Sequence, residues 1–400
     1  MKRKKLKKSI KILLAVLCTA LLAEIILFFV QRNRKAEEEV AAAEETAVPE
    51  PASTPEPTPE VYKASLFITG DALIHGTVWK DAYQADGTYD FSGQVELVGK
   101  LAEGYDLKYY NQETILGGTE LGLSGYPLFN SPQEVGDAMV GMGFNLVSTA
   151  TNHSLDQGQT GIRRSHDYWK RQEDEHGVHM AGTYISAEEQ AEIPVYEVNG
   201  ITYTFLSWTY GCNGLLPLEG YEWSVNIYTG HEDEMLEQVR KADAVSDVTI
   251  VALHWGTEYS MEANEEQKRL AVELSEAGAD ILVGNHPHVI QPVEWVNDHK
   301  TICYYAMGNM ISAQLEEQNL VGMVGGLDIV KTVFNGETTV EIKDPRADLI
   351  YTYYSNGYVN FKVIPFSQLD DAHLYNHDAV YEKYVTKINE YDDSIIVGMQ

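Results

Sequence analysis

Cysteine is scarce in this chain of 400 residues, and its three copies form no chemical motif. Cys18 lies in an apolar N-terminal segment, and Cys212 and Cys303 are far apart in the sequence. There is no CxxC pair and no Cys/His zinc-finger spacing, so cysteine does not carry the chemistry. Cys212 and Cys303 are able to pair in an oxidising compartment only if the fold brings them together, which the sequence does not establish.

Positive charge is nearly absent beyond the N-terminus. Residues 1–35 contain 10 of the 29 Lys and Arg residues, and the rest of the chain has 19 basic and 59 acidic side chains. Such an acidic domain repels nucleic acid, so DNA and RNA are excluded as partners. The charge is typical of a well-solvated surface, and a polyanionic substrate would have to be held locally, by metal ions or a few cations.

One long hydrophobic run is present, at residues 12–30. It has 19 residues with a single charge, Glu24, which is enough for roughly 28 Å of helix. Seven basic residues precede the run and three follow it, which predicts a cytoplasmic N-terminus and an extracytoplasmic domain. A cleavable signal peptide is the alternative, but no small-x-small cleavage site follows the run, which favours an uncleaved single-pass anchor.

Composition divides the rest of the chain. Residues 36–60 are rich in Ala and Glu and then in Pro, Glu and Thr, which predicts a disordered, extended linker. We therefore expect a basic stub and transmembrane anchor at 1–35, the linker at 36–60, a folded domain at 61–366, and a C-terminal extension of unknown role at 367–400.

The folded domain alternates strand and helix patterns. Ser131 precedes Pro132 and lies three residues before Glu134, a capping-box spacing that predicts a helix ending at Gly143. Buried-strand patterns at 65–69, 144–148, 248–253 and 281–284 alternate with helical patterns such as 232–244 and 265–277. This alternation predicts an α/β domain with a partly parallel sheet. The runs at 201–207, 338–342 and 358–363 show no helices between them and predict added antiparallel strands, in a mixed or a second sheet.

Polar side chains follow five of the predicted strands, at the point where each strand ends. These positions are Asp71 and His75; Asn111 and Glu113; Asn152 and His153; His254, Trp255 and Glu258; and His286 and His288. Ligands of open α/β sheets bind at the carboxyl ends of the strands, so we expect these side chains to meet in one basin.

The donor types predict a divalent-metal site. Imidazole, carboxylate and amide oxygen without thiolate suit Zn, Mn or Fe, with Mg also compatible. Two ions can share a carboxylate and activate a water molecule, and Glu113 is the candidate bridge. His286 and His288 flank a proline and, on an extended segment, would point in opposite directions; the turn must rotate both inward for each to serve an ion.

The ordered motifs GDxxxH, NxE, TNHxxDxG, HWGxE, GNHPHV and YAMGN, spread over about residues 62–312, resemble the CapA family of capsule and poly-γ-glutamate synthesis proteins. That family is similar to the calcineurin-like metallophosphoesterases. The resemblance implies a four-layer α-β-β-α sandwich with metal ions at the strand ends.

The resemblance also implies roles for individual residues. Asp71, His75 and His288 would bind one ion, Asn152, His254 and His286 the other, and Glu113 both. His153 would be the proton donor or oxyanion stabiliser and Glu258 a second catalytic candidate, while Asn111, Trp255 and Asn309 would line or support the pocket.

Three positions depart from the wider superfamily pattern: the GDxxxH spacing, Glu rather than Asp at 113, and Thr151 where Asn is common. They leave open whether one ion or two is bound.

Two functions follow from the resemblance. The first is a membrane-anchored, metal-dependent hydrolase acting outside the cell membrane on an anionic surface polymer or a phosphoester. The second is a non-catalytic subunit that binds metal and polymer beside the other membrane subunits of a capsule synthase. A purely structural surface protein is the third possibility, and it predicts that no metal binds.

Overall fold

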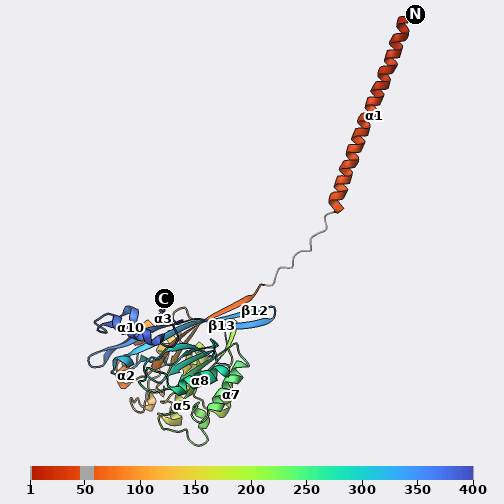
Figure 1. Cartoon of the computed structure of the whole chain (residues 1–400). Helices are drawn as coiled ribbons and strands as arrows, with labels where there is room; N and C mark the ends of the chain where they lie inside the picture. Colours follow the sequence, from red (N-terminus) through yellow and green to blue (C-terminus); the bar gives the residue numbers. More distant parts are fainter. Residues whose placement is uncertain (1, 46–57, 400) are drawn as a thin grey trace. The chain divides into compact units, whose positions relative to one another are not determined.

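The computed structural model describes residues 2–45 and 58–399, and the chain divides into two units, residues 1–58 and 59–400. The first unit contains helix α1 (Lys2–Glu45), drawn in red in Figure 1, and Leu6–Ala42 is long and apolar enough to cross a membrane. The helix continues past Lys35, so the prediction of an extended linker is wrong for residues 36–45, where Ala and Glu are strong helix formers. The linker prediction for residues 46–57 lies outside the described residues.

Two sheets form the second unit. In the nine-stranded sheet, the order is β14-β13-β12-β1-β2-β3-β4, with β11 beside β1 and β15 beside β13. In the six-stranded sheet, the order is β5-β6-β7-β8-β10-β9. The strands are β1 (Glu60–Ala72), β2 (Leu107–Asn111), β3 (Leu146–Ser148), β4 (His179–Ala181), β5 (Tyr196–Val198), β6 (Ile201–Thr209), β7 (Val248–His254), β8 (Ile281–Asn285), β9 (Val293–Val296), β10 (Thr301–Tyr304), β11 (Asn309–Ile311), β12 (Val321–Phe334), β13 (Glu337–Ser355), β14 (Val359–Pro365) and β15 (Ile396–Val397). Figure 1 shows β12 and β13 as long neighbouring strands.

The described helices of the second unit are α2 (Gly76–Asp81), α3 (Ser92–Leu101), α4 (Glu134–Gly141), α5 (Gly158–His176), α6 (Ala187–Ala191), α7 (Glu232–Asp243), α8 (Glu265–Glu276), α9 (Glu317–Leu320) and α10 (His377–Ile388), with short 3-10 turns at Thr119–Leu121, Glu222–Ser224 and Phe366–Gln368. Helices α3, α4, α5, α7 and α8 lie in connections between neighbouring parallel strands. Strands β1 to β4 run parallel, as do β6, β7, β8 and β10.

Alternation along the strands creates the layers. On β1, Leu66 and Ile68 belong to the core between the two sheets, whereas Phe67 belongs to the core beneath α3, α4 and α5. On β7, Ile250 faces the core between the sheets and Val251 the core beneath α7 and α8. The order is therefore helices, sheet, sheet, helices, and the predicted four-layer α-β-β-α sandwich is confirmed.

Two local predictions need correction, and the open question of whether Cys212 and Cys303 pair is answered. The run at 201–207 is more than an added antiparallel strand: it forms β6, which pairs antiparallel with β5 but in parallel with β7 through the crossover helix α7. The predicted cap at Ser131 is not formed, because α4 begins at Glu134 and the Ser131 hydroxyl pairs with Thr114. Cys212 and Cys303 are both buried and free.

The C-terminal segment, which has no readable motif, packs into the domain. Val380, Tyr384 and Ile388 of α10 join the core between the sheets, and β15 pairs with β13. The apolar spacing of α10, rather than any polar motif, explains why this segment folds onto the rest.

Asp280, in the turn between α8 and β8, is expected to make stability depend on pH. Burial raises the pKa of this carboxyl to about 7, and the nearby Asp243 adds to the rise. The N–H of Thr249 donates to Asp280 Oδ2 at 2.7 Å and opposes the rise in pKa. Because the pKa is higher in the folded than in the unfolded state, stability falls as the pH rises from about 4 to about 7. Asp280→Asn keeps an acceptor for Thr249, so it should melt higher than the parent at pH 8 and nearly level with it at pH 4. Thermal melts in EDTA measure this, and a difference that does not grow with pH would contradict it.

Candidate metal centre

Glu113 lies at the centre of the strand-end cluster, which we define as Asp71, Glu113, Asn152, His254, His286 and His288. It is buried just after β2, with Oε1 3.5 Å from His288 Nε2 and 3.9 Å from His254 Nε2. Neither carboxylate oxygen has a hydrogen-bond partner among the described residues. Burial raises the pKa of Glu113 well above its ordinary value; His288 opposes this and Asp71 adds to it. An unpartnered buried carboxylate is costly, and a cation bound between these groups would satisfy it.

Asp71 and His288 form one side of the cluster with Glu113. Donor atoms of these three residues all lie within 4.8 Å of one another. Asp71, at the end of β1, accepts the amide N–H of His286 at 3.1 Å and the side-chain amide of Asn111 at 2.8 Å. Burial lowers the pKa of His288, but Glu113 and Asp71 outweigh it and raise the value to about 9. In the metal-free chain, His288 therefore supplies positive charge beside the carboxylates of Asp71 and Glu113.

Asn152, His254 and His286 form the other side. Asn152 Oδ1 lies 3.2 Å from His254 Nε2, and the rings of His254 and His286 are 4.8 Å apart. Burial and the neighbouring imidazoles lower the pKa of His254 well below its ordinary value and that of His286 to about 3. Both rings are therefore neutral at physiological pH, the form in which imidazole binds metal.

The turn after β8 rotates two histidines into the cluster. His286 has φ 98° and His288 has φ 58°, values that are rare for residues other than glycine and store strain where they persist. Their ring centroids are 6.0 Å apart. The extended geometry that would send them to opposite sides is thus avoided.

His75 joins neither group of close donor atoms. Its Nδ1 accepts the N–H of Ala313 at 3.2 Å, and its ring packs edge-on against Phe129. Burial lowers the pKa of His75 to about 4, with His288 and His153 contributing. The metal role of His75 stays a prediction.

His153 is held by a buried carboxylate. Its Nδ1 lies 2.7 Å from Asp156 Oδ2, which also accepts the N–H of Phe129 at 2.7 Å. The His153 ring packs against that of Phe129, with 4.7 Å between centroids. A carboxylate on Nδ1 fixes the tautomer and leaves Nε2 as the end that can exchange a proton.

The model of the family described as "Bacterial capsule synthesis protein PGA_cap" matches residues 65–314. The chain belongs to this family. The resemblance inferred from the motifs is thereby confirmed.

Two curated relatives of this PGA_cap chain come from bacilli. The chain is 32% identical over 177 residues to "PGA biosynthesis protein CapA" of Bacillus subtilis (strain 168), covering 43% of this chain and 44% of that protein. It is 28% identical over 190 residues to "Capsule biosynthesis protein CapA" of Bacillus anthracis, covering 46% and 44%. The matches thus span less than half the length of either relative.

Solved structures are similar at low identity. A phosphatase from Mycoplasma pneumoniae is 12% identical with a TM-score of 0.42, covering 71% of this chain and 94% of that one. The calcineurin-like phosphoesterase YfkN from Bacillus subtilis is also 12% identical, with a TM-score of 0.39, covering 82% and 100%.

The predicted pocket residues of the PGA_cap chain have different positions. Asn309 Oδ1 accepts a hydrogen bond from His288 Nδ1 at 3.0 Å, and Asn111 links Asp71 to the Ser148 hydroxyl, so both support the strand-end cluster from behind. Glu258 is exposed at the cluster. Trp255 is a correction: it is fully buried beneath α8 in the core of the outer layer, where its indole N–H donates to the carbonyl of Tyr305, so it does not line an opening.

Sequence reasoning missed two residues beside the cluster. Asp156 is the acid of the TNHxxDxG motif, and its spacing of three from His153 was the available signal. The ring of Tyr210 lies 4.7 Å from that of His286, and burial raises the pKa of its hydroxyl to about 12. No motif marks Tyr210, because it becomes a neighbour of His286 only when β6 and β8 share a sheet.

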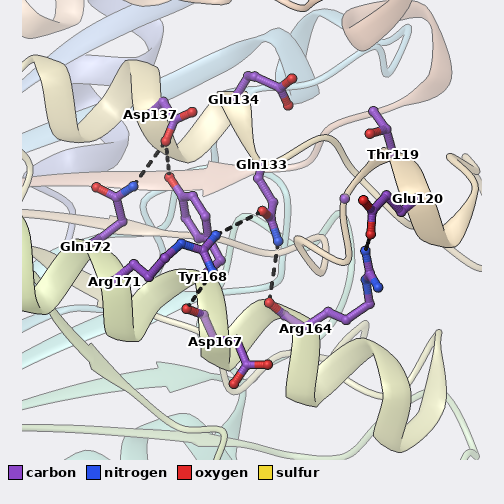
Figure 2. A pocket seen from close by; sticks show the side chains of 11 residues that line it. Thr119, Glu120, Gln133, Glu134, Asp137, Arg164, Asp167, Tyr168, Arg171 and Gln172 are labelled. Carbon is purple, nitrogen blue, oxygen red and sulfur yellow. Dashed lines mark hydrogen bonds and ion pairs between the residues drawn. The ribbon is translucent and has the colours of Figure 1, made fainter.

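A hollow of about 670 Å³ lies on α4, α5 and the loop before α4 (Figure 2). Several of its polar groups pair with one another: Arg164 binds Glu120 at 2.7 Å, and Tyr168 and Gln172 both donate to Asp137. Because these groups are already satisfied, the strand-end cluster, in which both oxygens of Glu113 have no partner among the described residues, is the better candidate for chemistry.

Proposed function

We propose that this PGA_cap chain is a membrane-anchored, extracytoplasmic, metal-dependent hydrolase that acts on an anionic capsule polymer or a phosphoester during capsule synthesis. The observation that carries the proposal is Glu113, a buried carboxylate with both oxygens unpartnered among imidazole, amide and carboxylate donors. The His153–Asp156 pair adds a proton-transfer group to a set of metal ligands.

The donor set fits divalent ions such as Mn, Zn, Fe or Mg, and a pair of ions better than one. Asp71 and His288 would hold one ion, Asn152, His254 and His286 the other, and Glu113 both. Bound there, the ions would polarise the scissile group and make a water molecule a better nucleophile.

The protein's own groups perform the remaining tasks. Asp156 accepts from His153 Nδ1–H and stabilises the charged ring, in which Nε2 carries the second proton that His153 gives to the leaving group. Asn111 and Asn309 hold Asp71 and His288 in place, as outer partners of metal ligands commonly do.

The anchor supports the location. Seven basic residues precede the apolar run and three follow it, so the N-terminus faces the cytoplasm and residues 59–400 lie outside, beyond the linker. The cell membrane and an acidic surface polymer are then the partners, without nucleic acid.

A second candidate is a non-catalytic accessory subunit of a membrane capsule synthase that binds the polymer through metal. The names of both curated relatives favour it, since they describe biosynthesis rather than hydrolysis. Fold and family do not decide between the two.

An assay on intact cells tests the hydrolase and its location together. Cells expressing the full chain are given phosphoesters and γ-glutamyl polymers, with and without EDTA, which does not cross the membrane. We expect hydrolysis that EDTA abolishes and that added Mn²⁺ or Zn²⁺ restores. Activity that appears only after lysis would contradict the location, and activity insensitive to EDTA would contradict the metal.

A further inference from the structure

A second group of close donor atoms lies on the solvent side of the strand-end cluster. Atoms of Glu258, His286 and His288 all fall within 4.8 Å of one another. This group shares only His288 with the buried group of Asp71 and Glu113. Glu258 is exposed while Asp71 and Glu113 are buried, so carboxylates approach the histidines from both the interior and the solvent side.

Backbone bonds tie the loop that carries Glu258 to the turn that carries the two histidines. The N–H of Trp255 donates to the carbonyl of Asn285 at 3.1 Å, and the N–H of Tyr259 donates to the carbonyl of Pro287 at 2.7 Å. Glu258 therefore lies on a loop whose register against His286 and His288 is fixed on both sides.

The loop conformation is specified by its sequence. Gly256 has φ 90°, and a Cβ there would come within 2.7 Å of Gln267 Oε1, so only glycine fits. Tyr259 has φ 65°, an uncommon value for a tyrosine. An ordinary surface acid needs no such construction, whereas a ligand held in position does.

We propose that Glu258 is a metal ligand that closes the ion site on its solvent side, next to His286 and His288. It would add a third carboxylate to those of Asp71 and Glu113, on the exposed side of the site. An acidic polymer or phosphoester that reaches the ions would compete with Glu258 for them. This inference rests on the metal binding of the proposed function, but not on hydrolysis.

Equilibrium binding of Mn²⁺ tests it. The full-length chain in detergent is stripped with EDTA and titrated with Mn²⁺, with free ion followed by its electron paramagnetic resonance signal. Glu258→Gln keeps the size of the side chain and removes its charge, and Glu265→Gln, at a 98% exposed side chain on α8, is the matched control. We expect about a 10-fold or larger loss of affinity for one ion in Glu258→Gln and none in the control, since loss of even outer partners of a metal site costs roughly 10–100-fold. Melts in EDTA should be unchanged in both.

The outcomes separate this inference from the proposed function. If Glu258→Gln binds Mn²⁺ as tightly as the parent while the parent hydrolyses substrate, the ligand role is wrong and the hydrolase stands. If Glu258→Gln binds more weakly but the parent turns nothing over, the ligand role stands and the hydrolase fails. A parent chain that binds no Mn²⁺ overturns both.

Discussion

Glu113→Gln is expected to strip the chain of its divalent ions without unfolding it. Glu113 lies between the two sides of the strand-end cluster, with Oε1 3.5 Å from His288 Nε2 and 3.9 Å from His254 Nε2. Gln offers one weaker oxygen in place of a charged carboxylate, so we expect metal affinity to fall by about 100-fold or more, given that loss of outer partners alone costs roughly 10–100-fold. Metal content per chain after dialysis against Mn²⁺ or Zn²⁺ measures this.

The metal-free stability of the same variant gives an independent test. Because neither oxygen of Glu113 is hydrogen-bonded, the charge of His288 offsets its burial only in part, and its replacement removes a costly buried group from the apo chain. Glu113→Gln should therefore melt no lower than the parent in EDTA, and it should lose the stabilisation that added metal gives the parent. Glu120→Gln is the control: it breaks only an exposed ion pair with Arg164 and should retain metal. Full metal occupancy in Glu113→Gln would rule out the bridging role.

The layers of the fold were predictable because they follow from local periodicity. Side chains of β1 alternate between two cores around Phe67, and apolar residues of α8 recur at Leu270 and Leu274. The spacing of apolar residues therefore indicates which face of each element is buried. Pairing direction was harder to predict. The sequence of β6 predicts only an antiparallel strand, because a long loop separates β6 from α7. Helix α7 makes the parallel crossover from β6 to β7, and the loop hides this strand–helix–strand pattern.

The strand-end cluster was predictable for a different reason. Carboxylate, amide and imidazole side chains at the ends of parallel strands gather at one edge of a sheet, so residues from Asp71 to His288 could be grouped from the sequence alone. Direction could not be predicted for side chains next to such ends. Trp255 follows His254 directly, yet the alternation of β7 turns it into the outer core, while Tyr210 reaches His286 only through the sheet.

His153→Gln is expected to separate the hydrolase from the accessory subunit. His153 contacts Asp156 and Phe129, and it belongs to neither group of close metal donors, so its loss should leave metal content unchanged. If Nε2 transfers a proton to the leaving group, hydrolysis should fall by about 10²–10⁴-fold. Asp156→Asn should also lower the rate of hydrolysis, because an amide in place of the carboxylate neither stabilises the charged ring of His153 nor fixes its tautomer.

His166→Gln supplies the matched control for this comparison. His166 is also a buried histidine on a carboxylate, with Nε2 2.5 Å from Glu189 Oε1, but that pair joins α5 to α6 and takes no part in the strand-end cluster. The His166→Gln variant should lose some stability. Its rate of hydrolysis per bound metal ion should stay unchanged, as measured by turnover divided by metal content. A scaffold that binds polymer needs the metal ligands and has no use for a proton donor. Equal loss in His153→Gln and His166→Gln would therefore mean that His153 is structural, whereas a parent chain that binds metal and hydrolyses nothing would favour the accessory role. A loss confined to His153→Gln and Asp156→Asn, with metal retained, would assign hydrolysis to this site.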